Sequence, residues 1–448
     1  MNFTVAERLE RLPLTSYQKI LFFIIATAWF FDCVDVGMMT FVLSSLKADF
    51  NLTAIQAGEL GSASFVGMFI GAAGAGLLAD KFGRCVVFRW SMIIWGLSSF
   101  ACAFVPDFNM LLLCRVALGI GMAMELPVGQ ALICEYVPAA VRGKYVALLE
   151  GFWPLGFVSA GVIATLILPV FGWRGTFIAE ALPALFVLFV RQIVPESPRW
   201  LEESGQLEEA DRVTTLIETK VMQAAKIDQL PEPRKFSAAP AEGTKRGFPL
   251  ADLWSKQYAK RTAMVWILWF FALLGYYALT TWLGTLLEAR GYSMARSNEY
   301  IILISLAGIP GFLFSAFLLE RWGRKPTTVL MLSCSAIFAY LYGNAPSLAL
   351  LIAAGLGMQF FLFGMWSALY AYTPELYPTR ARATGAGFAS SIGRIGALLG
   401  PSLVGFILPA AGQTGAFVLA AACLIVAALN VYFLGDETKG LVLEHCAS

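Results

Sequence analysis

The sequence predicts an all-α membrane protein with twelve transmembrane helices in two six-helix bundles related by pseudo-two-fold symmetry. Three observations predict this fold. Of the 448 residues, 58% are hydrophobic and only 14% are charged, against about 25% charged residues in soluble domains. The apolar residues gather in about twelve runs, each close to the roughly 20 residues that cross a bilayer. A short motif after the second run recurs after the eighth, which indicates an internal repeat.

The apolar runs predict the helices in order along the chain. Six runs precede the polar stretch 195–260 and six follow it. Residues 1–194 are therefore expected to form an N-terminal bundle, 195–260 a cytoplasmic linker with short amphipathic helices, and 261–448 a C-terminal bundle with a cytoplasmic tail. The helices are expected at 19–45, 55–79, 86–105, 109–134, 144–169, 173–194, 261–288, 297–320, 326–344, 346–372, 383–408 and 412–434.

A loop motif occurs once in each half of the chain. After the second predicted helix the sequence reads Asp80-Lys-Phe-Gly-Arg84, and after the eighth it reads Glu320-Arg-Trp-Gly-Arg324. An acid, a glycine and an arginine recur at the same spacing, which indicates two homologous halves. Such repeats place a ligand near the midplane, between the halves.

The positive charges predict how the chain is oriented. Most lysines and arginines fall on the side that holds both termini and the linker. Because cytoplasmic loops carry the excess of Lys and Arg, we expect both termini in the cytoplasm of a multi-pass protein of the plasma or inner membrane. Only four basic residues are expected on the outer side: Lys47, Arg174, Arg290 and Arg296.

The composition excludes several classes of function. A net charge of +2 gives no basic excess for binding nucleic acid. The one histidine, His445, lies in the C-terminal tail, and the eight cysteines show no zinc-binding spacing. The sequence therefore predicts no metal site and no cofactor. With no nucleophile and base pair recognisable, an enzyme is the least expected class.

Further motifs resemble the major facilitator superfamily of transporters. Arg115-Val-Ala-Leu-Gly119, Pro195-Glu-Ser-Pro-Arg199 and Asp436-Glu-Thr-Lys-Gly440 resemble its sugar-porter-like branch. Asp32-Cys-Val-Asp35 and Pro374-Glu-Leu-Tyr-Pro-Thr-Arg380 are similar to a narrower set. That set contains the bacterial niacin and metabolite:proton symporters, the synaptic vesicle glycoprotein 2 proteins and the organic ion transporters. The resemblance covers nearly the whole chain and implies rocker-switch alternating access.

Charged side chains inside the predicted helices are the first candidates for function, because a charge in the bilayer is costly. The resemblance implies that Asp35 and Arg115 form a pair broken by protonation, although a permanent ion pair is an equal alternative. Glu125, close to the same face as Arg115, is a further candidate for carrying the proton. Asp32 matches an acidic position of the vesicle-protein and organic cation relatives and is expected either to contact substrate or to serve as the second protonation site.

Three other charged residues differ in their expected roles. Glu150 and Glu180 lie within two turns of their predicted helix ends, where surface pairing is the favoured interpretation. Arg394 lies in the middle of helix 11, where the resemblance to organic anion transporters also implies an arginine. A guanidinium offers a planar fork of donors suited to a carboxylate. An anionic substrate is therefore favoured for Arg394 over a structural pair.

Aromatic side chains are expected beside Arg394. Four residues of helix 10 share one face at helical spacing, and helices 1, 5 and 7 each contribute a further aromatic residue. Core packing is the alternative for each aromatic residue taken singly. The predicted substrate site comprises Arg394, Asp32, Trp29, Trp153, Gln359, Phe363, Trp366, Tyr370 and Tyr277.

The loop motifs resemble a cytoplasmic gate formed by Asp80, Arg84, Glu320 and Arg324, whose charges would pair across the halves in one state. Together the residues and the resemblance predict a monomeric, proton-coupled secondary transporter that imports a small aromatic carboxylate, with nicotinate (niacin) as the first choice. The alternatives are a sugar, polyol or organic cation transporter of the same superfamily, and a transporter-like receptor without turnover.

Overall fold

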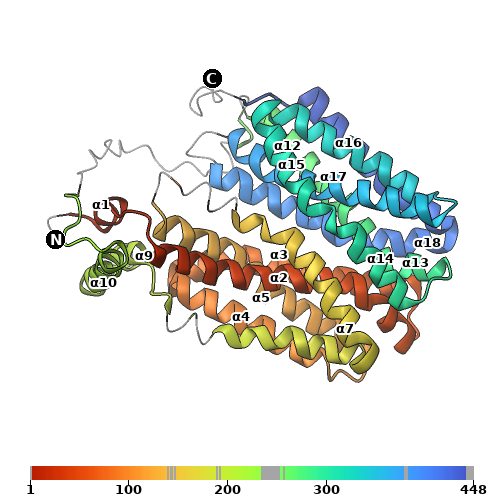
Figure 1. Cartoon of the computed structure of the whole chain (residues 1–448), viewed down its shortest axis with the longest axis horizontal. Coiled ribbons are helices and arrows are strands. Elements are labelled where there is room, and N and C mark those ends of the chain that lie inside the picture. The colour runs from red at the N-terminus through yellow and green to blue at the C-terminus, as the bar shows by residue number, and fades with distance from the viewer. Residues whose placement is uncertain are drawn as a thin grey trace.

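The computed structural model shows a protein that is helical and without strands in its described part, residues 3–138, 141, 145, 148–187, 190, 193–233, 253–255, 258–377 and 382–439 (Figure 1). In that part, nine helices are long and apolar enough to cross a membrane. Two of them, α7 and α18, each join two helices at a kink. Counting these as two crossings each and adding α3 gives the twelve predicted crossings.

The N-terminal half is built from long helices that follow the predicted runs closely. Helix α7 joins most of predicted helix 5 to the first part of predicted helix 6, and its C-terminal end continues into the 3₁₀ helix η1. The helices of this half are α2 (Ser16–Asp49), α3 (Ala54–Phe82), α4 (Arg84–Cys102), α5 (Phe108–Tyr136), α7 (Phe152–Ala181) and η1 (Leu182–Phe186).

The C-terminal half repeats this plan with two interruptions. Predicted helix 7 is divided into α12 and α13, and predicted helix 8 into α14 and α15. The helices are α12 (Ala259–Thr280), α13 (Leu283–Ala289), α14 (Met294–Leu306), α15 (Gly308–Arg321), α16 (Arg324–Gly343), α17 (Leu348–Glu375) and α18 (Arg382–Leu434).

The two halves repeat backbone features at an interval of 240 residues (412 − 172 = 240). Gly172 and Gly412 have φ values of 63° and 62° and mark the kinks of α7 and α18. Gly83 and Gly323, with φ values of 102° and 112°, precede α4 and α16 at the same interval. Only glycine adopts positive φ without strain. The repeat predicted from the loop motif therefore extends to the backbone of both halves.

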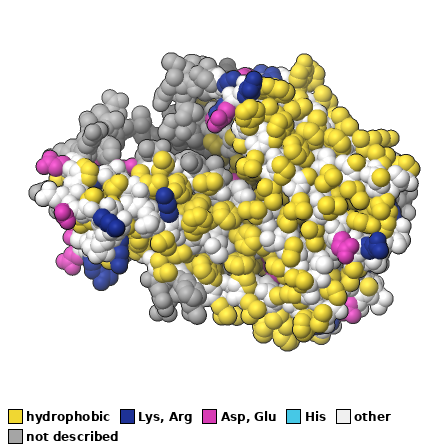
Figure 2. Space-filling model, viewed as in Figure 1, with side chains coloured by type: hydrophobic (Ala, Val, Ile, Leu, Met, Phe, Trp, Pro, Cys, Tyr) yellow, Lys and Arg dark blue, Asp and Glu magenta, His cyan; other side chains and the backbone are white. Residues whose placement is uncertain are grey.

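The outer surface is that of a protein solvated by lipid. Hydrophobic side chains cover the broad middle of the face shown in Figure 2, and charged side chains gather toward its ends. Large apolar residues are strongly exposed to the outside, including Leu166 (69%), Val170 (71%) and Phe433 (70%). Exposed apolar area on this scale needs an apolar solvent, which agrees with the apolar helices.

Three helices form a satellite at one end of the molecule, which is called the terminal face (left in Figure 1). They are α1 (Val5–Glu10), α9 (Pro198–Glu203) and α10 (Leu207–Ala225). Val5 and Leu9 of α1 belong to one buried cluster with Val213 and Ile217 of α10. The satellite therefore ties the N-terminal segment to the first part of the predicted linker, whose second part lies outside the described residues.

Polar contacts reinforce the satellite around one carboxylate. Glu218 accepts from Arg8 (Nη2–Oε2, 2.7 Å) and from Arg11 (Nη2–Oε1, 2.8 Å). Burial alone would raise the pKa of Glu218, but the hydrogen bonds and charges of the two arginines together hold that pKa below its ordinary value. The ionised carboxylate is therefore the form that stabilises the contact between α1 and α10.

Glu218→Gln should loosen α1 from α10, because it leaves two arginines without their shared anion. Limited digestion with trypsin should then cleave after Arg8 or Arg11 faster than in the wild type. A folded-state pKa below the unfolded one gives stabilisation that is present at neutral pH and is lost as the pH falls through the lowered value. Glu209→Gln is the matched control, since the Glu209 side chain is 41% exposed and pairs with Arg212 of its own helix. Equal cleavage of both variants would contradict this role for Glu218.

The two halves pack tightly against each other at the face opposite the termini. The first turns of α3 lie there against α18, where Ser62 Oγ donates to the Leu398 carbonyl (2.6 Å) and lies 2.8 Å from Ser402 Oγ. A methyl group at Gly58 would lie 2.8 Å from the Pro401 carbonyl oxygen, so glycine permits this approach. The described halves are thus closed together at this opposite face.

Candidate functional site

A cavity lies between the halves, and its empty space is about 730 Å³ when the solvent at its open side is included. Both halves contribute to its wall. The N-terminal half supplies Trp29, Asp32, Val36, Phe65, Met68, Met122, Ala123, Glu150 and Trp153. The C-terminal half supplies Trp269, Leu273, Tyr277, Phe312, Trp366, Tyr370, Ser390, Arg394 and Ala397.

Aromatic rings dominate this wall. Trp29 and Trp153 of the N-terminal half are stacked, with centroids 6.2 Å apart, and Trp366 and Tyr370 of α17 are stacked at 5.7 Å. Trp153 lies 5.7 Å from Trp366 and joins the two pairs across the interface between the halves. Its indole Nε1 also donates to the hydroxyl of Tyr276 (3.2 Å). The rings of both halves thus meet in one continuous surface.

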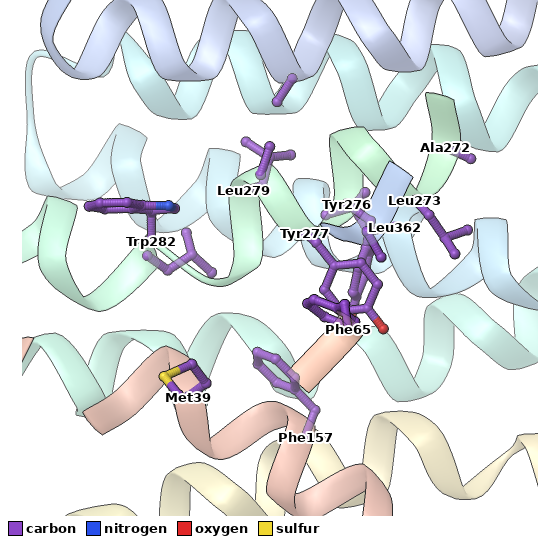
Figure 3. Packing of buried hydrophobic residues seen from close by; sticks show 14 of the residues in the cluster. Met39, Phe65, Phe157, Ala272, Leu273, Tyr276, Tyr277, Leu279, Trp282 and Leu362 are labelled. Carbon is purple, nitrogen blue, oxygen red and sulfur yellow. The ribbon is translucent and has the colours of Figure 1, made fainter. Parts of the chain in front are cut away.

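The aromatic surface continues toward the closed face. Phe65 of α3 packs against Tyr277 of α12 with centroids 4.4 Å apart, and Figure 3 shows the two rings in contact beside Tyr276 and Phe157. Contacts of this kind join residues that are far apart in the chain. They hold α12 against α3 on the closed side of the cavity.

One cation faces acidic side chains in this apolar space. Arg394 forms no hydrogen bond or ion pair with any described residue, although it interacts electrostatically with Asp32, Tyr277 and Tyr370. Asp32 is 1% exposed, and neither of its oxygens has a hydrogen-bond partner among the described residues. A buried charge without a partner is costly. Arg394 can therefore accept an anionic group that enters the cavity.

A buried ion pair lies behind the cavity. Arg115 Nη1 donates to Asp35 Oδ1 (3.1 Å), and Trp95 Nε1 donates to Asp35 Oδ2 (3.2 Å). Asp35 is fully buried and Arg115 is 2% exposed. The prediction that these residues face each other is confirmed by this contact, whereas their part in proton coupling stays a prediction.

Glu125 lies on α5 close to Asp32. It is 2% exposed, its Oε1 has no hydrogen-bond partner among the described residues, and the two carboxyls interact electrostatically. Cys33, next to Asp32, interacts with Asp32, Glu125 and Glu150 alike. Three acids therefore surround one thiol beside the cavity.

Most of the predicted substrate residues come together. Two of them, Gln359 and Phe363, do not line the cavity, although they share the helix face of Trp366 and Tyr370. Phe363 is fully buried and packs against Phe157 (5.9 Å) and Tyr276 (6.1 Å). Gln359 is fully buried one turn farther along, and no described residue bonds its amide. The predicted residues that line the cavity are Arg394, Asp32, Trp29, Trp153, Trp366, Tyr370 and Tyr277.

The structure buries two acids that the sequence predicts to lie near the surface. Glu150 is 5% exposed and lines the cavity, and Glu180 is 4% exposed close to Asp35 and Arg115. Surface pairing is thus wrong for both. For Glu180 a signal was available, because it continues a helical face of buried residues at i, i+3, i+4 and i+7. The earlier members of that face are Trp173, Thr176 and Phe177.

The arginines of the loop motifs pair within their own halves. Arg84 Nε lies 3.1 Å from Glu135 Oε1, and Arg324 contacts both oxygens of Glu375 at 2.8 Å. These pairs lie at corresponding positions of the two halves, 240 residues apart. Each fixes the end of a long helix at the terminal face.

The acids of the two loop motifs are Asp80 and Glu320. The side chain of Asp80 lies outside the described residues. Glu320 is exposed and has no ion pair within the described part of the chain. The pairing of the motif charges across the halves therefore stays a prediction for another state of the protein.

Comparison with known proteins identifies the family. The sequence model of the Major Facilitator Superfamily matches residues 25–341 and, in a second match, residues 300–443. The chain belongs to the Major Facilitator Superfamily. The superfamily membership and the predicted transporter class, as opposed to an enzyme, are thereby confirmed.

Two similar members of the superfamily match this chain over nearly their whole length. The chain is 36% identical over 441 residues to the niacin transporter NiaP of Acinetobacter baylyi, covering 98% of this chain and 99% of the relative. It is 34% identical over 429 residues to the putative niacin/nicotinamide transporter NiaP of Bacillus subtilis, covering 95% and 98%. The predicted similarity to bacterial niacin transporters is confirmed.

A solved structure has the same superfamily fold. The inward-open conformation of the xylose transporter XylE from E. coli matches with a TM-score of 0.73 over 96% of this chain and 99% of that chain. The sequence identity is 17%, so the match concerns the fold alone. It agrees with twelve helices in two bundles.

Proposed function

We propose that this superfamily member imports nicotinate, a small aromatic carboxylate, together with protons. The observation that carries the proposal is Arg394, a cation with no paired carboxylate among the described residues, in a cavity walled by aromatic rings. The names of the two NiaP relatives support nicotinate as the particular acid. Arg394 would bind the carboxylate through its fork of N–H donors.

Arg394 would bind the carboxylate of the substrate, and the aromatic wall would bind its ring. Offset stacking on Trp or Tyr favours a planar ring, and the rings of Trp153 and Trp366 offer one surface from each half. A substrate held there contacts both bundles. Its binding energy can therefore depend on how the bundles are arranged, which a transport cycle by alternating access requires.

Proton coupling is assigned to the acids beside the cavity. Asp35 holds Arg115 as an ion pair in this state. Protonating Asp35 would release Arg115, and a shift of α2 against α5 within the N-terminal half that separates the pair would favour uptake of the proton. Asp32 and Glu125 are the second candidates, because both are buried carboxyls next to the cavity.

The expected orientation of the chain identifies the outer and inner faces of the protein in this proposal. With both termini in the cytoplasm, the face closed by α3 and α18 is the outer face. In this orientation the structure is inward-facing. The protein is also proposed to act as a monomer. Asp80, Arg84, Glu320 and Arg324 would form the cytoplasmic gate when the inner side closes, with the arginines exchanging Glu135 and Glu375 for new partners.

Purified protein in proteoliposomes should accumulate labelled nicotinate when an inward proton gradient is applied. Accumulation should stop when a protonophore removes the gradient, because the downhill flow of protons drives it. Liposomes without protein and liposomes without a gradient are the controls. Binding without accumulation would instead support the transporter-like receptor, and accumulation that ignores the protonophore would contradict proton coupling.

Asp32 gives a second candidate function. It is a carboxyl without a hydrogen-bond partner among the described residues, in a cavity with aromatic walls. Such a site also suits an organic cation, which the anionic group and the ring faces would both attract. Competition against labelled nicotinate by small organic cations, sugars and polyols decides between these classes. Strong competition by a cation alone would favour this second candidate.

A further inference from the structure

Glu150 is a cavity residue with a defined orientation. Gln130 of α5 donates from Nε2 to Glu150 Oε1 at 2.8 Å, and no described residue bonds the other oxygen. Glu150 is 5% exposed and lies three residues before Trp153, which forms part of the aromatic wall. The carboxyl is therefore fixed at one oxygen and free at the other, beside the place where a ring would stack.

No cation among the described residues is bonded to Glu150. Among the described titratable groups, Glu150 interacts electrostatically with the thiol of Cys33 on α2 and with Tyr370 on α17, and neither is a cation. Burying an ionised carboxylate without a cationic partner costs far more than burying the neutral acid. Glu150 is therefore assigned the carboxylic acid form, in which one oxygen accepts from Gln130 and the other carries an O–H donor.

Tyr370 is a common neighbour of Glu150, which carries the O–H donor, and of Arg394, the residue proposed to bind the carboxylate of the substrate. It interacts electrostatically with both Glu150 and Arg394, and all three line the same cavity. A ring stacked on this wall would therefore have Arg394 near one part of its edge and Glu150 near another. Arg394 suits an anion, and a neutral O–H suits a hydrogen-bond acceptor.

We infer that Glu150 is a specificity residue that donates a hydrogen bond to the ring nitrogen of the substrate, with Gln130 as its positioning residue. The inference rests on the proposed function and refines it. It names the substrate class as a carboxylate on a ring that carries an acceptor atom. Asp32 is less suited to this role, because both of its oxygens are buried and no neighbour orients them.

Nicotinate and benzoate test the inference, because they differ only in the ring nitrogen. Calorimetry on the purified, full-length protein should show nicotinate binding more tightly than benzoate by on the order of 10- to 100-fold. Glu150→Met should reduce this preference to within about threefold, with the affinity for benzoate unchanged. Glu150→Gln should keep the preference, because the amide N–H can replace the O–H as donor.

The controls separate this role from a structural one. Glu59→Gln, an exposed acid of α3, should behave as the wild type. If Glu150→Met does not fold, Gln130→Leu makes the same test by freeing the carboxyl without adding a group to the cavity. A full preference for nicotinate in Glu150→Met, or in Gln130→Leu where that variant replaces it, overturns the inference. So does equal binding of both ligands to the wild type, whereas binding of neither ligand overturns the proposed function itself.

Discussion

Replacing Arg394 with alanine should weaken nicotinate binding by on the order of 2–5 kcal/mol, the range for removing one partner of a desolvated charge pair. Arg394 has no ion pair with a described residue, so the loss would come from the ligand and not from a broken structural contact. Arg394→Lys should weaken binding less, since it keeps the charge but replaces a planar fork with a single point charge.

Nicotinamide provides the matched ligand for this prediction. It keeps the ring and lacks the negative charge, so the wild type should bind it less tightly than the acid. Arg394→Ala should discriminate less between the two, and calorimetry with both ligands measures that difference. Arg296→Ala is the control, because Arg296 is an exposed arginine of the same half. If nicotinamide or a cation bound the wild type more tightly than nicotinate, and Arg394→Ala bound as before, Arg394 would be structural.

The sequence was sufficient to predict which faces of the helices meet the cavity, but not how deep the cavity extends. Spacing by three and four residues placed Trp366 and Tyr370 on one face with Phe363. All three do share that face, yet only the first two line the cavity. Phe363 is covered by Tyr276 and Phe157, which come from other helices. Helical periodicity predicts the face of the helix on which a side chain lies. Whether that side chain reaches the cavity depends on which residues of other helices pack over it.

Distance from a helix end was a poor guide to burial. Glu150 and Glu180 were expected at the surface because they lie near the ends of their predicted helices. In the structure, neighbouring helices cover both ends: Gln130 of α5 bonds Glu150, and Glu180 lies near Asp35 of α2. Position along a helix relates to depth only where no other helix lies across it. The ion pair of Asp35 and Arg115 was predictable because the resemblance supplied the partner that spacing alone could not.

Asp35→Asn should abolish accumulation of nicotinate against its gradient and leave counterflow exchange intact. Asparagine has nearly the same shape as aspartic acid and can still accept from Trp95, but it carries neither a charge nor a titratable proton. The variant would resemble a carrier whose proton site is always neutral. It could exchange labelled for unlabelled substrate, which needs only reorientation of the loaded protein, but the proton gradient could not drive net uptake.

Asp49 provides an unusually close control for this experiment. It lies on the same helix, and it also accepts from one arginine and one tryptophan: Arg174 Nη1 at 3.1 Å and Trp173 Nε1 at 3.0 Å. The corresponding distances at Asp35 are 3.1 and 3.2 Å. The two sites differ in burial, because the side chain of Asp49 is 48% exposed and that of Asp35 is fully buried.

This difference decides what each substitution should do. An exposed ion pair contributes roughly 0–1 kcal/mol, so Asp49→Asn should leave both accumulation and counterflow at the level of the wild type. A buried pair that opens and closes as α2 shifts against α5 during the transport cycle can link that cycle to a proton. If Asp35→Asn still concentrates nicotinate under a proton gradient, the Asp35–Arg115 pair is a permanent structural pair. The same test on Asp32→Asn and Glu125→Gln would then show whether either of those acids carries the proton.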